Sequence, residues 1–295
     1  MYQACLTEGK PVPEPPLRLM CVHAHPDDES SKGAATMAKY AAEGVAVTVL
    51  TLTGGERGDV LNPALDTPDT WARLPEIRTQ EMARAAALLG VDQVWLGYED
   101  SGFTLEEPWQ NLPPGSLAAT DVRESGARMA DILVTYRPHV VVTYDESGGY
   151  AHPDHVMCHR VSMKALSYAA DKEKYGDRAW TVPKVYYQMG FHMGRFQALN
   201  AAMEARGLGS PYADRLQRTY DPMDHRVTTR VECGEFFAVR DDALRAHATQ
   251  VDPKGHWFVV PLDVQRAAWP TEDYELVRSD VPVTLPETDL FAGLR

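Results

Sequence analysis

Apolar and polar residues alternate in blocks through residues 17–170, in a pattern typical of strands and helices that follow one another in turn. Short apolar runs predict buried strands, and longer amphipathic stretches predict the helices that cover them. The predicted strands are 17–24, 45–52, 93–96 and 139–143. The predicted helices are 30–43, 76–89, 120–136 and 153–170. This order predicts an α/β fold with a Rossmann-like, mainly parallel sheet flanked by helices and with right-handed crossovers.

The pattern changes in the second half of the chain. Shorter strand-like runs, 182–189 and 235–239, are mixed with short helices such as 241–249. We therefore expect three parts. They are a loose, proline-rich N-terminal extension over 1–16, a Rossmann-like core over 17–178, and a smaller C-terminal cap of strands and helices over 179–295 that completes a pocket.

The most informative residues stand where two of the predicted strands end. The segment 23–29 reads His-Ala-His-Pro-Asp-Asp-Glu, and the segment 150–155 reads Tyr-Ala-His-Pro-Asp-His. In each segment a proline follows a histidine, which ends the strand and allows a helix to begin. Open α/β sheets bind ligands at the carboxyl ends of their strands, so we expect both segments to face one crevice.

The two segments contain the ligands that a catalytic metal ion needs. Catalytic zinc takes three protein ligands, from His and Asp or Glu among others, and keeps one position for water. His25, Asp28 and His155 supply that number. The other polar side chains here can take, give or stabilise a proton. They are Asp27, Tyr150, His152 and Asp154.

Two residues near these segments have simpler explanations. A run of carboxylates after a proline is typical of a helix N-terminus, where it caps free N–H groups, and we keep that interpretation for Glu29. His159 lies four residues after His155 on the same helical face, but packing or solvent exposure is the role we expect for it.

The cofactor is expected to be one divalent ion. Zn²⁺ suits the ligands best, and Fe²⁺ and cobalt accept the same set.

Composition and charge restrict the kinds of partner and the cellular compartment that we expect. The chain has 295 residues, 44% hydrophobic and 24% charged, as in an ordinary globular protein. Its net charge of −13 opposes binding to nucleic acid or to an anionic membrane, which need a basic face. No long apolar stretch predicts a membrane span, and the first 16 residues are too polar for a signal peptide. Four cysteines without C-x-x-C spacing favour a reduced, cytoplasmic setting, and a homo-oligomer is compatible with the sequence.

The segments 24–29 and 152–155 resemble those of the LmbE-like (PIG-L) family of zinc-dependent N-acetylglucosaminyl deacetylases and amidases. Three stretches, 22–35, 50–58 and 244–250, are similar to the amidase branch, which acts on S-conjugates of mycothiol. The resemblance covers about residues 17–274. It implies the metal ligands named above and gives the neighbouring side chains catalytic roles. Asp27 is the general base, Tyr150 and His152 assist at the carbonyl oxygen and the leaving amine, and Asp154 orients His152 and keeps it protonated.

The resemblance also implies which side chains bind the sugar and inositol hydroxyls of a substrate. They are Glu56 and Arg57 of the glycine-rich loop 53–58, together with Arg78, Asp100 and His247. The loop lacks both nucleotide-binding glycine patterns. For Arg57, Arg78 and Asp100 a salt bridge within the protein is an equally good explanation. Lys32, one turn past the metal carboxylates, is implied as a substrate contact specific to the amidase branch.

The implied activity is metal-dependent hydrolysis of the amide bond between the cysteinyl and glucosaminyl-inositol parts of a mycothiol S-conjugate. The products would be a mercapturate and glucosaminyl-inositol, and the partner a small-molecule pseudodisaccharide thiol conjugate. One alternative is a deacetylase of N-acetylglucosaminyl-inositol, and another is an amidase that tailors natural products. A distant alternative is a non-catalytic sugar- or metal-binding module, which would have no use for Asp27 or His152 beside the ligands.

Overall fold

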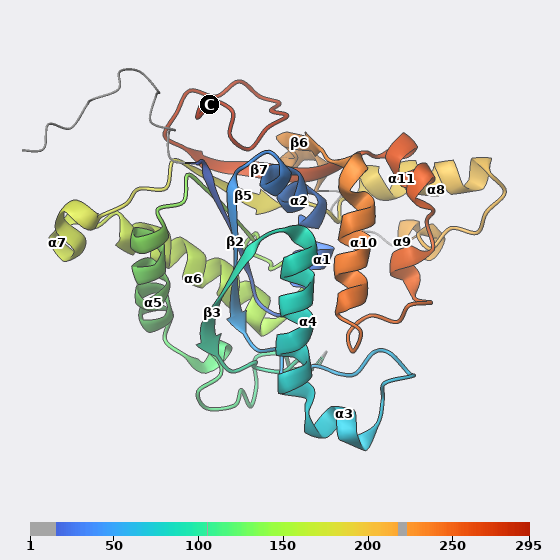
Figure 1. The fold of residues 1–295 in the computed structure, drawn as a ribbon, viewed down its shortest axis with the longest axis horizontal. Helices are drawn as coiled ribbons and strands as arrows, with labels where there is room; N and C mark the ends of the chain where they lie inside the picture. Colours follow the sequence, from blue (N-terminus) through green and yellow to red (C-terminus); the bar gives the residue numbers. More distant parts are fainter. Residues whose placement is uncertain (1–15, 105, 218–222) are drawn as a thin grey trace, which may run out of the picture.

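The computed structural model describes residues 16–104, 106–217 and 223–295, so the predicted extension over 1–16 lies almost wholly outside the described residues. A seven-stranded sheet with the order β3-β2-β1-β4-β5-β7-β6 forms its centre (Figure 1). Strands β1 to β5 run parallel, whereas β7 is antiparallel to β5 and to β6. The mainly parallel α/β sheet predicted from the sequence is confirmed. The strands are β1 Arg18–His23, β2 Ala46–Thr53, β3 Asp92–Tyr98, β4 Val140–Thr143, β5 Lys184–Gln188, β6 Thr229–Glu232 and β7 Thr271–Ser279.

Helices cover both faces of this sheet (Figure 1). The longer ones are α2 Ala34–Ala42, α4 Leu74–Leu89, α5 Val122–Tyr136, α6 Pro153–Ala169, α8 Met193–Ala205 and α10 Phe237–Ala246. Leu19 and Cys21 of β1 pack with α2 and α4, whereas Met20 and Val22 pack with α5 and α6 on the other face. Because successive side chains of a strand point to opposite faces, one apolar strand joins both halves of the core.

Successive strands of the chain are added first on one side of β1 and then on the other. Strand β2 pairs with one side of β1, and β4 pairs with the other side. In open α/β sheets such a reversal leaves a crevice beyond the carboxyl ends of the two strands. The two His-Pro-Asp segments follow β1 and β4, so the topology brings both to this crevice.

The predicted helix over 30–43 is interrupted in the structure. A short helix α1, Asp28–Ser31, precedes α2, and Gly33 between them has φ of 95°. A positive φ is easy for glycine and ends a regular helix. The break allows α1 and α2 to take different directions.

The strand predicted over 235–239 was wrong. A 3₁₀ turn, Gly234–Phe236, leads there into helix α10. Phe237, Arg240 and Leu244 are buried along α10 at helical spacing, so the aromatic residues begin an amphipathic helix rather than a strand. The strands β6 and β7 and the short helix α11, Leu262–Ala268, were not predicted.

Three cysteines in the described part of the chain, Cys21, Cys158 and Cys233, are buried and not in disulfides. Within residues 16–104, 106–217 and 223–295, none of the helices combines the length and apolar character needed to cross a membrane.

The C-terminal segment is fixed to the sheet by a buried ion pair. Lys184 Nζ at the start of β5 lies 2.6 Å from Glu287 Oε1, and both side chains are almost fully buried. Tyr186 donates its hydroxyl to the other oxygen of Glu287 at 2.8 Å.

Glu287→Ala should lower the free energy of unfolding by about 3–5 kcal/mol, because it leaves the Lys184 ammonium buried without its counter-charge. Urea unfolding followed by circular dichroism measures this change. Asp242→Ala breaks the exposed pair with Arg245 and is the matched control, for which little change is expected. Equal effects of the two substitutions would contradict the assignment of Glu287.

Candidate metal centre and active site

The structure brings His25, Asp28 and His155 together at the crevice. His25 lies just beyond β1, Asp28 begins α1, and His155 lies in the first turn of α6. Asp28 Oδ2 is 3.5 Å from His25 Nδ1 and 3.4 Å from His155 Nε2. Two ligands about 2.0–2.1 Å from a tetrahedral ion are roughly 3.4 Å apart. The three donor atoms therefore have the spacing of a metal ligand set.

His155 is oriented for such a role. Its Nδ1 lies 3.0 Å from the carbonyl oxygen of Gly148, which places the ring proton on Nδ1. Its buried Nε2 then carries a lone pair and has no hydrogen-bond partner among the described residues. Gly148 has φ of 72°, and a Cβ there would lie 2.6 Å from the Cβ of His155, so glycine is required for this approach.

His25 is oriented by carboxylates. Its Nε2 lies 3.3 Å from Asp154 Oδ2 and 3.7 Å from Asp100 Oδ1, which leaves Nδ1 facing Asp28. Metal-binding histidines generally donate their second ring N–H to a carboxylate or a carbonyl oxygen. Both histidines have such a partner, so this donor set fits a divalent ion.

Asp28 is held in its ionised form. Burial alone would raise the pKa of its carboxyl group, but His155 and Lys32 outweigh burial and hold that pKa well below its usual value. Lys32 Nζ lies 2.5 Å from Asp28 Oδ1 and 3.1 Å from Ser31 Oγ. The lysine expected to contact substrate thus contacts the oxygen of Asp28 that faces away from the histidines.

Asp27 has a strained backbone, with φ of 109° and ψ of −27°. A non-glycine residue in such a conformation costs about 1–3 kcal/mol and persists only where the surroundings impose it. Here Glu29 Oε2 accepts the Asp27 N–H at 2.9 Å, and Arg78 Nη2 donates to Asp27 Oδ2 at 3.1 Å. Burial raises the pKa of the Asp27 carboxyl group, and Arg78 opposes this shift.

Arg78 and His247, both expected to bind substrate, are buried and contact Asp27 and its neighbour Glu29. Arg78 also donates to the carbonyl oxygens of Pro26 and Gly55. His247 Nε2 lies 2.6 Å from Glu29 Oε1, so it holds the carboxylate that orients the Asp27 backbone. Burial would lower the pKa of His247, but Glu29 outweighs it and raises that pKa.

His152 and Asp154 differ from the expected pairing. The Asp154 carboxylate accepts hydrogen bonds from Ser101 Oγ at 2.5 Å and from Ser101 N at 2.8 Å, and its other near partner is His25. His152 Nδ1 instead accepts the backbone N–H of Asp154 at 3.1 Å. Burial, with the nearby His25 and His155, lowers the pKa of His152 to about 3. The imidazole is therefore neutral, with its proton on Nε2.

Two aromatic rings border His152 at the mouth of the site. Phe103 stacks on the His152 ring with centroids 5.1 Å apart. The half-exposed Tyr150 places its ring centroid 4.6 Å from that of His155, and burial raises the pKa of its hydroxyl, which stays protonated. Ligand-capable atoms of a second group also lie within 4.8 Å of one another. That group is His25, Asp100, His152 and Asp154.

The glycine-rich loop after β2 lies against the end of β3. Glu56 Oε1 accepts the Asp100 N–H at 3.0 Å, and the Arg57 N–H donates to Asp100 Oδ2 at 3.3 Å. The exposed Arg57 guanidinium pairs with Glu99. Glu56, Arg57 and Asp100 thus lie together on the β2–β3 side of the crevice.

Sequence reasoning missed three positioning residues. Gly148 and Ser101 hold His155 and Asp154, as described above. The Tyr144 ring stacks on His155 with centroids 4.7 Å apart. The position of Tyr144 directly after the apolar run of β4 was the only sequence signal for it.

Residues 20–166 match the family model described as PIG-L: GlcNAc-PI de-N-acetylase. The chain is 51% identical over 287 residues to a mycothiol S-conjugate amidase of Streptomyces coelicolor, covering 95% of this chain and 98% of that protein. It is 41% identical over 292 residues to a 1D-myo-inositol 2-acetamido-2-deoxy-alpha-D-glucopyranoside deacetylase of Streptomyces griseus, covering 95% and 90% of the two chains.

Solved structures share the fold at low sequence identity. The N,N'-diacetylchitobiose deacetylase of Pyrococcus horikoshii is 18% identical with a TM-score of 0.59, and the match covers 88% of this chain and 83% of that one. A 4-carboxy-2-hydroxymuconate hydratase of Pseudomonas putida is 17% identical with a TM-score of 0.58, covering 91% and 99%. The fold alone therefore does not decide which reaction is catalysed.

Asp154→Asn should weaken zinc binding by about 10- to 100-fold, because it alters the carboxylate that orients His25. His155→Ala should weaken it further, since two protein ligands remain. Zinc affinity measured by competition with a chromogenic chelator tests both. Asp27→Ala is the matched control and should bind zinc as the unmodified protein does. Metal loss in Asp27→Ala with retention in His155→Ala would contradict the ligand assignment.

Proposed function

The chain belongs to the PIG-L family, and from this membership we propose that it is a metal-dependent amidase of mycothiol S-conjugates. It hydrolyses the amide bond between the cysteinyl and glucosaminyl-inositol parts and releases a mercapturate and glucosaminyl-inositol. The observation that carries the proposal is 51% identity, over nearly the full length of both chains, to an amidase with this substrate. The deacetylase relative, at 41% identity, supports deacetylation of N-acetylglucosaminyl-inositol as the second candidate.

His25, Asp28 and His155 would hold the divalent ion, with Zn²⁺ preferred and Fe²⁺ accepted by the same ligands. Such an ion supplies Lewis acidity at the scissile carbonyl and lowers the pKa of a water molecule. Asp27 takes the proton of the attacking water. Its carboxylate stands beside the ligands without being one of them, and its raised pKa makes it a better base than an ordinary aspartate.

The remaining side chains act on the carbonyl oxygen and the leaving nitrogen. Tyr150, protonated at neutral pH, donates a hydrogen bond to the developing oxyanion. His152 is neutral and donates through Nε2, so it assists without being an imidazolium. Asp27 then delivers the proton it has taken to the glucosamine nitrogen. In this scheme Asp154 orients the His25 ring and does not contact His152 through its carboxylate.

The substrate lies across the crevice. Glu56, Arg57 and Asp100 on the β2–β3 side bind sugar and inositol hydroxyls, for which charged partners give strong hydrogen bonds. Lys32 Nζ lies 2.5 Å from Asp28 Oδ1 and 5.8 Å from the centroid of the Tyr144 ring, and we assign it to the acyl-cysteine half. A small molecule as partner and a cytoplasmic setting agree with the net charge of −13 and with the three buried thiols.

Zinc-reconstituted protein should cleave a mycothiol S-conjugate with kcat/KM at least about tenfold above that for N-acetylglucosaminyl-inositol. Released amine and mass spectrometry of both products measure the two activities side by side. Asp27→Ala should lower kcat on either substrate by about a hundredfold or more, because the base is lost. Faster deacetylation would favour the second candidate, and no turnover of either substrate by the loaded protein would overturn both.

His152→Ala should lower kcat by about a hundredfold and leave both pH limbs of kcat/KM in place. The pKa of His152 is about 3, so the group is already neutral across the neutral range in the free enzyme that kcat/KM reports. A pH series of initial rates on one conjugate tests this. Disappearance of the alkaline limb in His152→Ala would show that His152 titrates there as an imidazolium, as the resemblance implies.

A further inference from the structure

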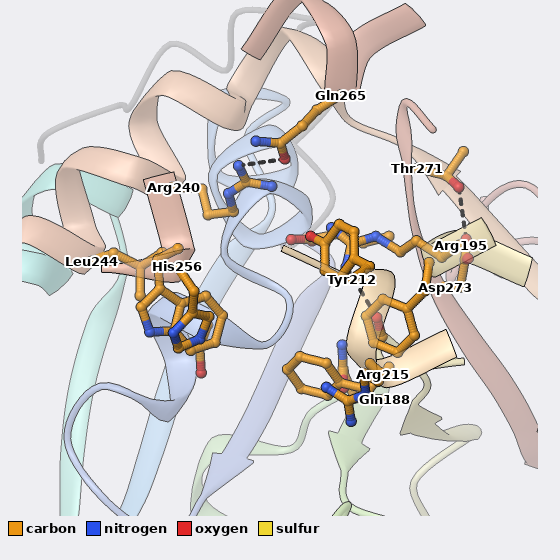
Figure 2. Close-up of a pocket in the computed structure, with 16 residues that line it drawn as sticks. Gln188, Arg195, Tyr212, Arg215, Arg240, Leu244, His256, Gln265, Thr271 and Asp273 are labelled. Carbon is orange, nitrogen blue, oxygen red and sulfur yellow. Dashed lines mark hydrogen bonds between the residues drawn. The ribbon is translucent and has the colours of Figure 1, made fainter. Parts of the chain in front are cut away.

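A second pocket opens at the same edge of the sheet, over the end of β5 and the start of β7 (Figure 2). Its volume is about 100 Å³, and α1, α8, α10 and α11 all contribute to its wall. In Figure 2 the side chains of Arg195 and Tyr212 point toward one another from different elements, and that of Arg240 points toward Gln265. The pocket is separate from the three metal-ligand side chains, and the mechanism above does not use it.

Arg195, from the first turn of α8, lines this pocket together with Arg215 and Arg240. Its Nη1 donates to the carbonyl oxygen of Gly190 at 3.1 Å, and in the described part of the chain no carboxylate forms an ion pair with it. Burial lowers the pKa of Arg195, and the nearby Arg240 adds to this effect. A guanidinium has five N–H donors, so most of the donors of Arg195 remain for a ligand.

The carboxylates in the pocket wall are already occupied. Glu272 accepts the backbone N–H groups of Ala35 and Thr36 at the start of α2. Asp273 accepts hydrogen bonds from His192 at 2.7 Å and from Trp269 at 2.8 Å.

Arg240 differs from Arg195 in having partners. It pairs with Asp241 at 2.7 Å and donates to Gln265 at 2.9 Å. None of the described carboxylates in the pocket wall forms an ion pair with Arg195, so a ligand that pairs with Arg195 has to bring its own anion.

Aromatic rings line the same pocket, and the Arg215 guanidinium lies 4.5 Å from the centroid of the Phe196 ring. Phe196 packs against Tyr212 with ring centroids 5.1 Å apart and against Phe191 at 6.5 Å. Phe191 is partly exposed, so the apolar wall is accessible. Aromatic faces in a pocket that also contains guanidinium groups suit a planar apolar group that carries a negative charge.

The pocket is connected to the metal centre through α1. Ser31 lines the pocket, its Oγ accepts from Lys32 Nζ at 3.1 Å, and Lys32 contacts Asp28. Neighbouring strands are about 4.8 Å apart, so the end of β5 is roughly 10 Å from the end of β1 across β4. The pocket lies on the opposite side of β1 from the β2–β3 loops that carry Glu56 and Asp100.

We propose that this pocket binds the S-substituent of the conjugate and that Arg195 favours aromatic substituents that carry a carboxylate. The proposal rests on the proposed function, because it assumes that the scissile amide lies at the metal centre. The sugar half then extends toward β2 and β3, and the acyl-cysteine half extends past Lys32 into the pocket. The conjugate has no carboxylate near its amide, so the anion that pairs with Arg195 comes from the S-substituent.

Three conjugates of mycothiol test this assignment with the zinc-loaded full chain. They carry S-(4-carboxybenzyl), S-benzyl and S-methyl groups. Arg195→Gln should raise KM for the carboxybenzyl conjugate by about ten- to a hundredfold, the effect of one charge-assisted hydrogen bond. KM for the benzyl conjugate should change by less than about threefold, and that for the methyl conjugate should stay the same. Arg206→Gln, at the exposed end of the same helix, is the matched control and should change none of them.

The outcomes separate this proposal from the proposed function. If no conjugate is cleaved by the unmodified protein, the proposed function fails. If the conjugates are cleaved but Arg195→Gln changes all three equally, or none, the pocket assignment alone is overturned.

A second measurement does not depend on folding of the variant. Free 4-carboxybenzyl mercapturate should inhibit the unmodified protein at least about tenfold more strongly than benzyl mercapturate, and equal inhibition would also overturn the assignment.

Discussion

The active site depends on one buried carboxylate, that of Asp28. Its oxygens face two histidines and a lysine, and Oδ2 also accepts the N–H of His25. A buried charge without partners is costly, so these groups must come together for the fold to tolerate it. They come from β1, α1 and α6, which meet only because β4 pairs with β1 on the side away from β2. The pairing of β4 with β1 thus assembles the ligands, and it also joins the two halves of the core, which lie on the two faces of the sheet.

A second layer of buried groups supports this centre. Ser101 holds Asp154, which orients His25, and Gly148 orients His155. Arg78 and the pair of Glu29 with His247 hold Asp27 in its strained conformation. The candidate ligands and Asp27 are therefore positioned by buried side chains around them. The strength of these contacts comes from charge-assisted hydrogen bonds between buried groups.

The two sides of the crevice differ chemically. The β2–β3 side presents carboxylates and an exposed arginine, which suit hydroxyl groups. The β5–β7 side has a pocket lined by arginines and aromatic rings, which suits an apolar group with an anion. An amide substrate with a sugar on its nitrogen and a variable thioether on its acyl part matches this division. The shared fold of a deacetylase and a hydratase agrees with specificity that lies in such loops and pockets.

The sequence by itself determined the parallel core and the ligand candidates, because strands such as β1 and β4 are apolar runs and each is followed by a His-Pro-Asp segment. Local patterns failed where packing decides the conformation. The strand predicted over 235–239 is a 3₁₀ turn and the start of α10, and Gly33 divides a predicted helix in two. Only the tertiary structure showed that Arg78 and His247 are buried supports and that Asp154 serves His25. It also formed the Arg195 pocket. Such roles depend on which groups lie nearby after folding, and residues far apart in the sequence leave no local signal of that proximity.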